Sequence, residues 1–481
     1  MKLKNPALFK QKCYIDGKWR VGSETFQVHN PSKGTLVGEA PKMGAKETEE
    51  AIQAAWRAFP SWSSKTAKER SQIIRRWFEL VLENIDDLAA IMTTEQGKPL
   101  TEALGEIRYG ASFLEWFSEE AKRVYGDLIP SAVKNQHLLV IKQPIGVVGA
   151  ITPWNFPSAM ITRKCAPSLS VGCTIVIKPA EATPFSALAL AELASQAGIP
   201  PGVLNIVTGD PILIGEELTR NPLVRKITFT GSTRVGKILM AQSAATVKKV
   251  SLELGGSAPF LVFADADLES AVKGLIASKF RNTGQACICA DRIFVQDSIY
   301  EAFTHKLVHA VQTLKVGDGF EPGVQQGPLI NSAAVEKVER HIKNAVAKGA
   351  RIACGGKKHS LGKTFYEPTV LCNVDPTMEI MREETFGPVA PLMPFRTEEE
   401  AIRMANDTNY GLGSYLYTRD IDRMWRVAEA LEFGMVSVNG GIFSNEVAPF
   451  GGVKESGIGR EGSKYGIDDY LEIKYICVTP S

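Results

Sequence analysis

The sequence predicts an α/β protein built around a doubly wound, mostly parallel β-sheet. Beyond Gly146, short apolar runs alternate with segments that carry apolar residues at helical spacing. The runs are apolar on both faces, as expected for strands buried in a parallel sheet. The chain has 481 residues, which is too long for one hydrophobic core, so two or three domains are expected.

The first 145 residues precede this alternation. Residues 13–19 alternate and then turn at Asp16-Gly17, which predicts a β-hairpin. Apolar side chains at helical spacing predict amphipathic helices over residues 47–59, 66–96 and 100–124. Residues 137–142 alternate like an exposed strand and are a candidate contact with a partner subunit.

Four buried strands are predicted next, with helices between them. The strands are predicted at residues 147–151, 174–177, 204–207 and 226–229, and the helices at 157–170, 184–197 and 211–220. Doubly wound sheets bind ligands outside the carboxyl ends of their strands. The residues that follow the strands are therefore candidate site residues: Asn155, Lys178, Glu181 and Gly231.

Composition argues against several classes of function. The chain has 55 basic and 53 acidic side chains, so its net charge of +2 gives no case for binding nucleic acid or an anionic membrane. It has no run of 18 apolar residues and no apolar segment of a secretory signal near its start. Its eight cysteines lack the spacing of a metal site or a disulfide framework. These features predict a cytoplasmic protein without a metal.

The main candidate for chemistry is Cys287. Gly284 and Gln285 interrupt regular structure just before this thiol, and an apolar run resumes after it. A cysteine on such a turn lies within reach of a substrate. Burial as a small hydrophobic residue is the common alternative, and this stretch alone leaves it open.

Two loops are candidate cofactor sites. Residues 229–237 (FTGSTRVGK) follow a strand and open a helix, so backbone N–H groups around Gly231, Ser232 and Gly236 face an anion, although Gly-Ser-Thr is also typical of helix capping. Lys178 and Glu181 follow another strand; they are either solvated loop charges or ligands of an adenosine ribose. A carboxylate there repels a 2′-phosphate and favours NAD over NADP. The Gly-x-Gly-x-x-Gly at residues 457–462 has no βαβ context and is predicted to be a loop.

Seven motifs follow one another along nearly the whole chain. They are TPWNFP (152–157), KPAE (178–181), FTGS (229–232), LELGG (252–256), GQAC (284–287), ETFGP (384–388) and PFGG (449–452). The set resembles the aldehyde dehydrogenase superfamily. The likeness is closest to bacterial succinate-semialdehyde dehydrogenases, especially at residues 161–164, 280–282 and 444–450.

The resemblance implies an aldehyde dehydrogenase-like α/β fold with three parts. A Rossmann-type NAD-binding domain is expected over residues 1–126 and 144–256, and an α/β catalytic domain over 257–455. Residues 127–143 and 456–481 are expected to form a small β oligomerisation element that makes a homodimer or a homotetramer. The alternating pattern of residues 470–478 is consistent with a strand that joins a sheet.

The resemblance also assigns catalytic roles. Cys287 is the nucleophile, and Asn155 with the backbone N–H at Cys287 stabilises the oxyanion. Glu253 is the general base that hydrolyses the thioester, and its flanking leucines are expected to raise its pKa by desolvation. Glu461 matches a carboxylate that assists proton transfer.

Binding roles follow from the same resemblance. Glu384 holds the nicotinamide ribose and Phe386 lies beside the ring. The other expected cofactor-binding residues are Thr152, Pro153, Trp154, Lys178, Glu181, Gly231, Ser232 and Gly236. Arg163, Arg281 and Ser444 are expected to bind the far carboxylate of a short ω-semialdehyde, because a guanidinium fork pairs well with a carboxylate.

The expected activity is NAD(P)-dependent oxidation of succinate semialdehyde to succinate through a cysteine thiohemiacetal and a thioester. NAD is expected to be preferred, with NADP as the alternative cofactor. Glutarate semialdehyde or another short ω-carboxy aldehyde is the alternative substrate, because one methylene is worth only about 1–3 kcal/mol in discrimination. The resemblance further suggests that Cys289 forms a redox switch with Cys287; the alternative is that Cys289 points into the core.

Three other functions are weighed against this one. A CoA-acylating dehydrogenase would replace hydrolysis by thiolysis, and Glu253 argues against it. A cofactor-independent thiol esterase would need Cys287 without a nucleotide site. A purely structural protein would need neither.

Overall fold

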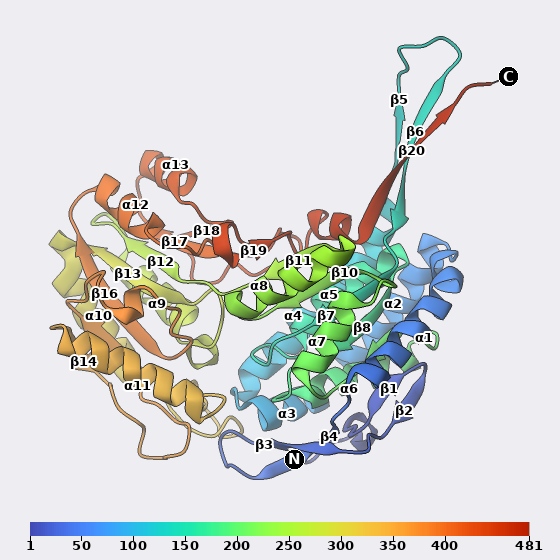
Figure 1. Cartoon of the computed structure of the whole chain (residues 1–481). Helices are drawn as coiled ribbons and strands as arrows, with labels where there is room; N and C mark the ends of the chain where they lie inside the picture. The colour runs from blue at the N-terminus through green and yellow to red at the C-terminus, as the bar shows by residue number, and fades with distance from the viewer. Residues whose placement is uncertain (481) are drawn as a thin grey trace.

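The computed structural model describes residues 1–480, and it contains two α/β bodies and a projecting β-sheet. One body is built on an eight-stranded sheet and the other on a seven-stranded sheet, while a three-stranded sheet extends away from both (Figure 1). This architecture confirms the predicted α/β fold class.

The eight-stranded sheet contains the four strands predicted from the alternating pattern. Its order is β19 (Gly457–Ile458), β11 (Lys249–Glu253), β10 (Val224–Thr230), β7 (Val147–Ile151), β8 (Thr174–Lys178), β9 (Leu204–Ile206), β1 (Cys13–Ile15) and β2 (Lys18–Arg20). The strands from β11 to β9 are parallel, and β19, β1 and β2 are antiparallel to their neighbours. The predicted hairpin is confirmed as β1–β2.

The segment Gly457–Gly462 differs from its prediction. Its first two residues form β19 and pair with Leu252 and Glu253 of β11, so only the remainder is a loop. These two residues therefore belong to the first sheet, although the sequence grouped everything from residue 456 onward with the oligomerisation element. Pairing with a strand 200 residues away leaves no local signal in the sequence.

Helices cover both faces of this sheet. One face carries α1 (Ala45–Ser63), α7 (Pro211–Arg220) and α8 (Thr233–Ser243); the other carries α2 (Ala67–Glu83), α3 (Ile85–Gln96), α4 (Leu100–Glu120), α5 (Ala159–Val171) and α6 (Pro184–Gln196). Alternation along the strands explains the two layers: Val147 and Val176 pack toward α1 and α7, whereas Val148 and Ile175 pack toward the other layer.

The single helix predicted over residues 66–96 is wrong, because two helices occupy this segment. Asn84 separates α2 from α3 with φ −109° and ψ 20°. Its backbone N–H and its side-chain amide both donate to the carbonyl of Leu80, which satisfies a carbonyl at the end of α2. The local asparagine bond competes with continued helix.

The strand order places a ligand crevice in the first body. The chain runs from β7 through α5 to β8 and through α6 to β9, and then crosses by α7 to β10 on the opposite side of β7. The connection therefore reverses between β7 and β10, which is where open α/β sheets bind ligands at the carboxyl ends of their strands.

The second body is built on a seven-stranded sheet. Its order is β14 (Arg351–Cys354), β15 (Thr369–Cys372), β16 (Val389–Phe395), β13 (Ala290–Gln296), β12 (Ala258–Val262), β17 (Gly413–Tyr417) and β18 (Met435–Val438). One face packs on α9 (Leu268–Lys279) and α10 (Tyr300–Gln312), and the other on α11 (Ser332–Ala347), α12 (Glu398–Asn406) and α13 (Ile421–Ala430).

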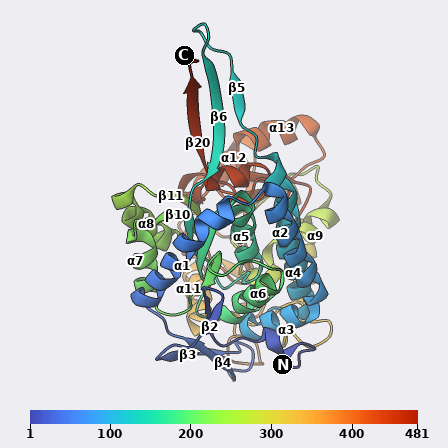
Figure 2. The same cartoon turned by 90° about the vertical axis from the view of Figure 1, so that its right-hand side faces the viewer.

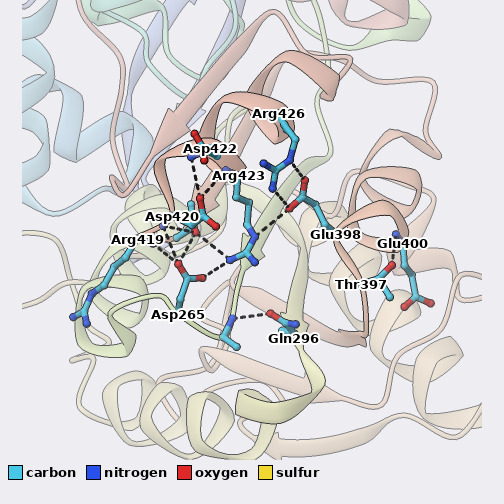
Figure 3. Close-up of polar contacts among 12 residues, drawn as sticks. Asp265, Gln296, Thr397, Glu398, Glu400, Arg419, Asp420, Asp422, Arg423 and Arg426 are labelled. Atoms are coloured by element: carbon cyan, nitrogen blue, oxygen red, sulfur yellow. Dashed lines mark hydrogen bonds and ion pairs between the residues drawn. The ribbon is translucent and has the colours of Figure 1, made fainter.

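An ion-pair network holds α12 and α13 against this sheet (Figure 3). Arg423 of α13 lies 2.6 Å from Asp265, which follows β12, and 3.2 Å from Glu398 at the start of α12. Glu398 also pairs with Arg426 at 2.8 Å. The Asp265 carboxylate accepts from the backbone of Arg419 at 2.7 Å, so the loop that enters α13 is fixed as well.

The three-stranded sheet contains β20 (Leu471–Val478), β6 (His137–Pro144) and β5 (Asp127–Ile129) in that order. Figure 2 shows it standing clear of both bodies. It exposes apolar side chains, including Leu128 at 75% and Ile473 at 72%. The strands predicted at residues 137–142 and 470–478 are both found here.

The remaining elements are short. A two-stranded sheet joins β3 (Thr25–His29) to β4 (Leu36–Pro41). Single 3-10 turns occur at Pro6–Leu8, Ala121–Arg123, Ala244–Thr246, Asp297–Ile299, Glu379–Met381, Lys454–Ser456 and Tyr465–Tyr470. Within residues 1–480, no helix combines the length and apolar character that a membrane crossing requires.

Candidate active site

The loop that carries Cys287 is held in a strained conformation. It follows the 3-10 turn η4 (Arg281–Gly284), in which Asn282 and Thr283 have φ values of 49° and 57°. The Asn282 side-chain amide donates to the carbonyls of Asn155 at 3.0 Å and Gln285 at 3.2 Å. Left-handed residues other than glycine cost about 1–3 kcal/mol each and persist where surrounding contacts hold them, typically at functional sites.

Close backbone packing also fixes this loop. A Cβ added to Gly256 would lie 2.2 Å from the carbonyl oxygen of Cys287. Only glycine lets the chain after β11 approach the nucleophile so closely. Gly256 also donates its backbone N–H to Glu384 Oε1 at 3.1 Å, which ties a third segment to the same point.

Cys287 opens on a cavity of about 350 Å³ at the carboxyl ends of β7, β10 and β11. The thiol is half-buried. The other lining residues include Pro153, Trp154, Asn155, Gly231, Ser232, Glu384 and Phe386, together with Lys337 of α11, which sequence reasoning missed. The structure thus brings the candidate nucleophile together with most of the predicted cofactor-binding residues, in the crevice that the strand order indicates.

Asn155 lies where it can stabilise an oxyanion. Its side-chain Nδ2 donates to the carbonyl of Gln285 at 3.0 Å. An amide nitrogen carries two hydrogens, so one remains for a ligand in the cavity. The Gln285 contact orients the amide toward the loop of Cys287.

A buried ion pair that sequence reasoning missed supports Asn155 from behind. Lys98 Nζ pairs with Glu106 and donates to the carbonyl of Asn155 at 2.7 Å. Glu106 Oε1 in turn accepts from the backbone N–H groups of Ser158 at 2.9 Å and Ala159 at 3.2 Å, at the start of α5. The side chains of Lys98 and Glu106 are each only 1% exposed. No local pattern marks either residue, because both contacts join different elements.

Glu253 ends β11 as a buried carboxylate, and its Oε2 has no hydrogen-bond partner among the described residues. Burial and the nearby negative charge of Glu461 raise the pKa of Glu253 well above its usual range, while Arg163 and Lys164 oppose them. The direction agrees with the desolvation expected from the sequence. A carboxyl with a raised pKa and a free oxygen is suited to accept a proton from water.

Glu461 forms a buried cluster with two cations of α5. Arg163 Nη2 lies 2.7 Å from Glu461 Oε2, and Lys164 Nζ pairs with Oε1 while also donating to Thr230 Oγ1 at 2.7 Å. Burial opposes ionisation of Glu461, but Lys164 and Arg163 outweigh it and lower the pKa of this carboxyl. Glu461 is therefore charged beside Glu253.

Arg163 is held by this cluster and by aromatic rings. Its guanidinium carbon lies 4.2 Å from the centre of the Phe450 ring and 5.5 Å from that of Phe113. Its side chain is only 3% exposed. In this arrangement the guanidinium faces Glu461, so its predicted contact with the substrate stays a prediction.

Arg281 and Ser444 meet in a second cavity of about 490 Å³. The Arg281 guanidinium stacks over Phe156, with its central carbon 4.9 Å from the ring centre, and Phe156 also lines the cavity of Cys287. Arg281 has no ion-pair or hydrogen-bond partner within residues 1–480. Phe156 thus contacts the Arg281 guanidinium of one cavity and lines the cavity that holds the thiol.

The thiols of Cys287 and Cys289 resist ionisation. Burial and the Glu384 charge raise the pKa of Cys287 to about 12, against the opposing effect of Arg163. Burial also raises the pKa of Glu384 to about 7. Cys289 is 2% exposed, and burial raises its pKa to about 12. The predicted switch between Cys289 and Cys287 stays a prediction.

The cavity fits a nicotinamide dinucleotide. Gly231 and Ser232 line the cavity, and Ser232 caps the N-terminus of α8, the end of a helix that favours anions. A Cβ on Gly231 would lie 2.4 Å from the Phe229 ring, so a side chain there is excluded. Phe386, at φ 56°, stands edge-on to Trp154 with ring centres 5.5 Å apart. Anion-binding amides and an aromatic slot are what phosphates and a planar ring need.

The two carboxylates predicted to bind riboses, Glu181 and Glu384, each have a partner within the protein. Lys178 ends β8 and its Nζ pairs with Glu181, which is 42% exposed. Glu384 lines the cavity and accepts the backbone N–H of Gly256 on one carboxylate oxygen. Thr152 and Gly236 lie beside this region: Thr152 donates its backbone N–H to Lys178, and Gly236 packs against Leu254.

Comparison with known proteins identifies the family. Residues 19–476 match the aldehyde dehydrogenase family model. This chain belongs to the aldehyde dehydrogenase family. Members of this family are oxidoreductases that act on aldehydes with NAD(P).

Several relatives match along their full lengths. The chain is 60% identical to the glutarate-semialdehyde dehydrogenase of Pseudomonas aeruginosa, over 99% of each protein. It is 59% identical to the NADP(+)-named succinate-semialdehyde dehydrogenase of Escherichia coli, over 99% of this chain and 100% of that one. The crystal structure of succinate-semialdehyde dehydrogenase from Burkholderia pseudomallei superposes with a TM-score of 0.99 at 61% identity, covering 100% of both chains.

Proposed function

We propose that this aldehyde dehydrogenase oxidises succinate semialdehyde to succinate, with NAD preferred over NADP. The observation that carries the substrate class is Arg281, an unpaired guanidinium in a cavity next to that of the nucleophile. A guanidinium in a cavity beside that of the thiol favours an aldehyde with a carboxylate at its far end. The names of the relatives, succinate- and glutarate-semialdehyde dehydrogenase, support the same class.

The side chains account for each step. The Cys287 sulfur loses its proton and bonds to the aldehyde carbon, while the oxygen becomes an oxyanion that Asn155 Nδ2 and the Cys287 backbone N–H stabilise. A nicotinamide held in this cavity would supply the hydride acceptor, and loss of hydride from the Cys287 adduct would leave a thioester on the sulfur. Glu253 then takes a proton from water, the water oxygen bonds to the thioester carbon, and the carbon–sulfur bond breaks to release the acid.

The raised pKa of Cys287 makes a base necessary in the first step as well. Besides burial, the negative charges of two nearby carboxyls, Glu384 and Glu253, raise the pKa of the Cys287 thiol. Arg163 lowers the pKa of the thiol, and its charge is largely compensated by Glu461. We infer that Glu253 takes the proton of the thiol, releases it to solvent, and then takes a proton from the attacking water.

The preference for NAD rests on Glu181. Its carboxylate follows β8 and is balanced by Lys178, which gives the ribose hydroxyls an acceptor and leaves no unpaired cation for a 2′-phosphate. The E. coli relative is named for NADP(+), so the ratio of the two activities has to be measured on this chain.

Glutarate semialdehyde is the second candidate substrate. The P. aeruginosa relative carries that name at 60% identity. Its extra methylene would be accommodated at a cost of about 1–3 kcal/mol or less. The cavity of about 490 Å³ around Arg281 has room for either chain length.

We also propose that the three-stranded sheet is the oligomerisation element of a homodimer or homotetramer. Its exposed Leu128, Ile473 and Tyr475 lie far from both cores, and β20 and β5 are open sheet edges. Sedimentation at micromolar concentration should give a dimer or a tetramer. A monomer would overturn the proposal.

The function is tested by initial rates of NADH and NADPH formation. Succinate semialdehyde, glutarate semialdehyde and the uncharged butanal are compared for the wild type, Cys287→Ala and Arg281→Met. We expect cysteine-dependent turnover, fastest with NAD and succinate semialdehyde, and a loss of about 10- to 100-fold in kcat/KM for both carboxylated substrates in Arg281→Met. A wild type that turns over butanal as well as succinate semialdehyde would refute the substrate class.

A further inference from the structure

We propose that the Tyr109 hydroxyl donates a hydrogen bond to the far carboxylate of the substrate and thereby sets specificity for ω-carboxy aldehydes. This role rests on the proposed function. Tyr109 lies on α4, far in sequence from Arg281 and Ser444, and it shares their cavity of about 490 Å³.

The placement follows from helix periodicity. Thr101, Gly105 and Tyr109 are spaced by four residues, so they form one stripe of α4 and line one wall of the cavity. Arg281 and Ser444 line the wall contributed by the second body. Tyr109 ends the stripe nearest the buried cluster of Phe156 and Met160, where the two cavities adjoin.

The Tyr109 hydroxyl is buried and makes no well-formed hydrogen bond to a described residue. The Ser444 hydroxyl is nevertheless a hydrogen-bonding neighbour that lowers its pKa. Buried tyrosine hydroxyls almost always make a well-formed hydrogen bond. The ring is fixed by an edge-on contact with Phe113, with centres 5.0 Å apart at 75°. The hydroxyl is therefore an oriented donor beside the Ser444 hydroxyl, and a substrate carboxylate could accept from both.

Charges around the hydroxyl favour an anion. Arg163 and Arg281 both act on Tyr109, as does the negative Glu461. Glu461 compensates Arg163. Arg281 forms no ion pair within residues 1–480, although it acts on the partly buried Glu102, which lines the same cavity. A neutral donor beside the Arg281 guanidinium matches the several acceptor positions of a carboxylate.

Tyr109 retains the proton that it donates. Burial raises its pKa, and the opposing effects of Arg163, Arg281 and the nearby Ser444 hydroxyl do not overcome it. The phenol stays neutral throughout the range in which an enzyme of this kind works. An aldehyde that ends in a methyl group leaves this hydroxyl without an acceptor, which is the condition for strong discrimination.

The test is Tyr109→Phe, which removes one oxygen and keeps the ring. We measure kcat/KM for succinate semialdehyde and for butanal, and succinate binding by calorimetry in a Cys287→Ala background with and without the second change. The ratio of kcat/KM for succinate semialdehyde over butanal should fall about 10- to 100-fold, mainly through KM. This factor corresponds to the free energy that a hydrogen bond to a charged group contributes. Succinate binding should weaken by a similar factor.

Tyr366→Phe is the matched control. Tyr366 is a buried tyrosine in the core of the second body, away from both cavities, so its substrate ratio should equal that of the wild type. An unchanged ratio in Tyr109→Phe would overturn the inference, and so would an equal loss with both aldehydes, which indicates packing alone. A wild type without preference for the carboxylated aldehyde would overturn the proposed function and this inference together.

Discussion

Replacing Glu461 by Gln removes the carboxylate that neutralises two buried cations. Arg163 lies 2.7 Å from Glu461 Oε2, and Lys164 pairs with the other oxygen. The side chains of all three are at most 5% exposed. The amide keeps the shape and one acceptor but removes the charge that pairs directly with both cations.

The loss of stability is large for a single substitution. Breaking a buried ion pair by removing one partner costs about 3–5 kcal/mol. For a cooperative unit of about 250 residues, each kcal/mol lowers Tm by about 2 °C, so the expected decrease is about 6–10 °C. The pKa of Glu461 is lowered in the folded protein, so its stabilisation is present above the pKa of the unfolded chain and is lost as pH falls through the folded pKa. The difference in Tm should therefore be greatest at neutral pH and should shrink in acid.

The same substitution changes the ionisation of the general base. The charge of Glu461 raises the pKa of Glu253, whereas Arg163 and Lys164 lower it. In Glu461→Gln the repulsion disappears and both cations act without compensation, so the pKa of Glu253 falls. Since the base must be unprotonated, the acidic limb of the pH profile of kcat moves to lower pH.

The assays are differential scanning fluorimetry and steady-state kinetics between pH 5 and 10. Glu269→Gln is the control, because Glu269 pairs with Lys306 on the surface with 78% of its side chain exposed. That control should melt with the wild type. A Glu461→Gln protein that melts like the wild type, with an unmoved acidic limb, would refute the electrostatic account of this site.

Three further predictions concern the same cavity. Asn155→Ala should lower kcat about 10²–10³-fold without weakening NAD binding, because it removes one oxyanion donor. Steady-state kinetics measure the first effect and fluorescence titration of NAD the second. An unaltered kcat would be inconsistent with this role. Lys98→Met should lower both Tm and kcat, because Glu106 stays buried without its cation and the carbonyl of Asn155 loses its hydrogen-bond donor. Adding Glu106→Gln to the same chain should restore part of the Tm. Glu181→Gln should raise the ratio of kcat/KM for NADP over NAD about tenfold or more, because a like charge no longer faces the 2′-phosphate; an unchanged ratio would place the discrimination elsewhere.

The sequence by itself determined the strands, the edge of the sheet that carries the site, and the nucleophile loop. Continuous apolar runs report burial on both faces of a parallel sheet, so β7, β8, β9 and β10 were readable without any tertiary contact. The carboxyl ends of these strands then fix where polar residues such as Asn155 must gather. These signals are local, so they can be recognised in the amino-acid sequence alone.

Only the tertiary structure decided what the charged residues do. Arg163 and Glu461 are 298 positions apart, and their contact depends on α5 packing against the turn that follows β19. Lys98 reaches the carbonyl of Asn155 in the same way, from a loop before α4. Nothing near these residues in the sequence distinguishes them from solvated charges, because the desolvation and the partner that give each its pKa and its role arise only when distant elements meet.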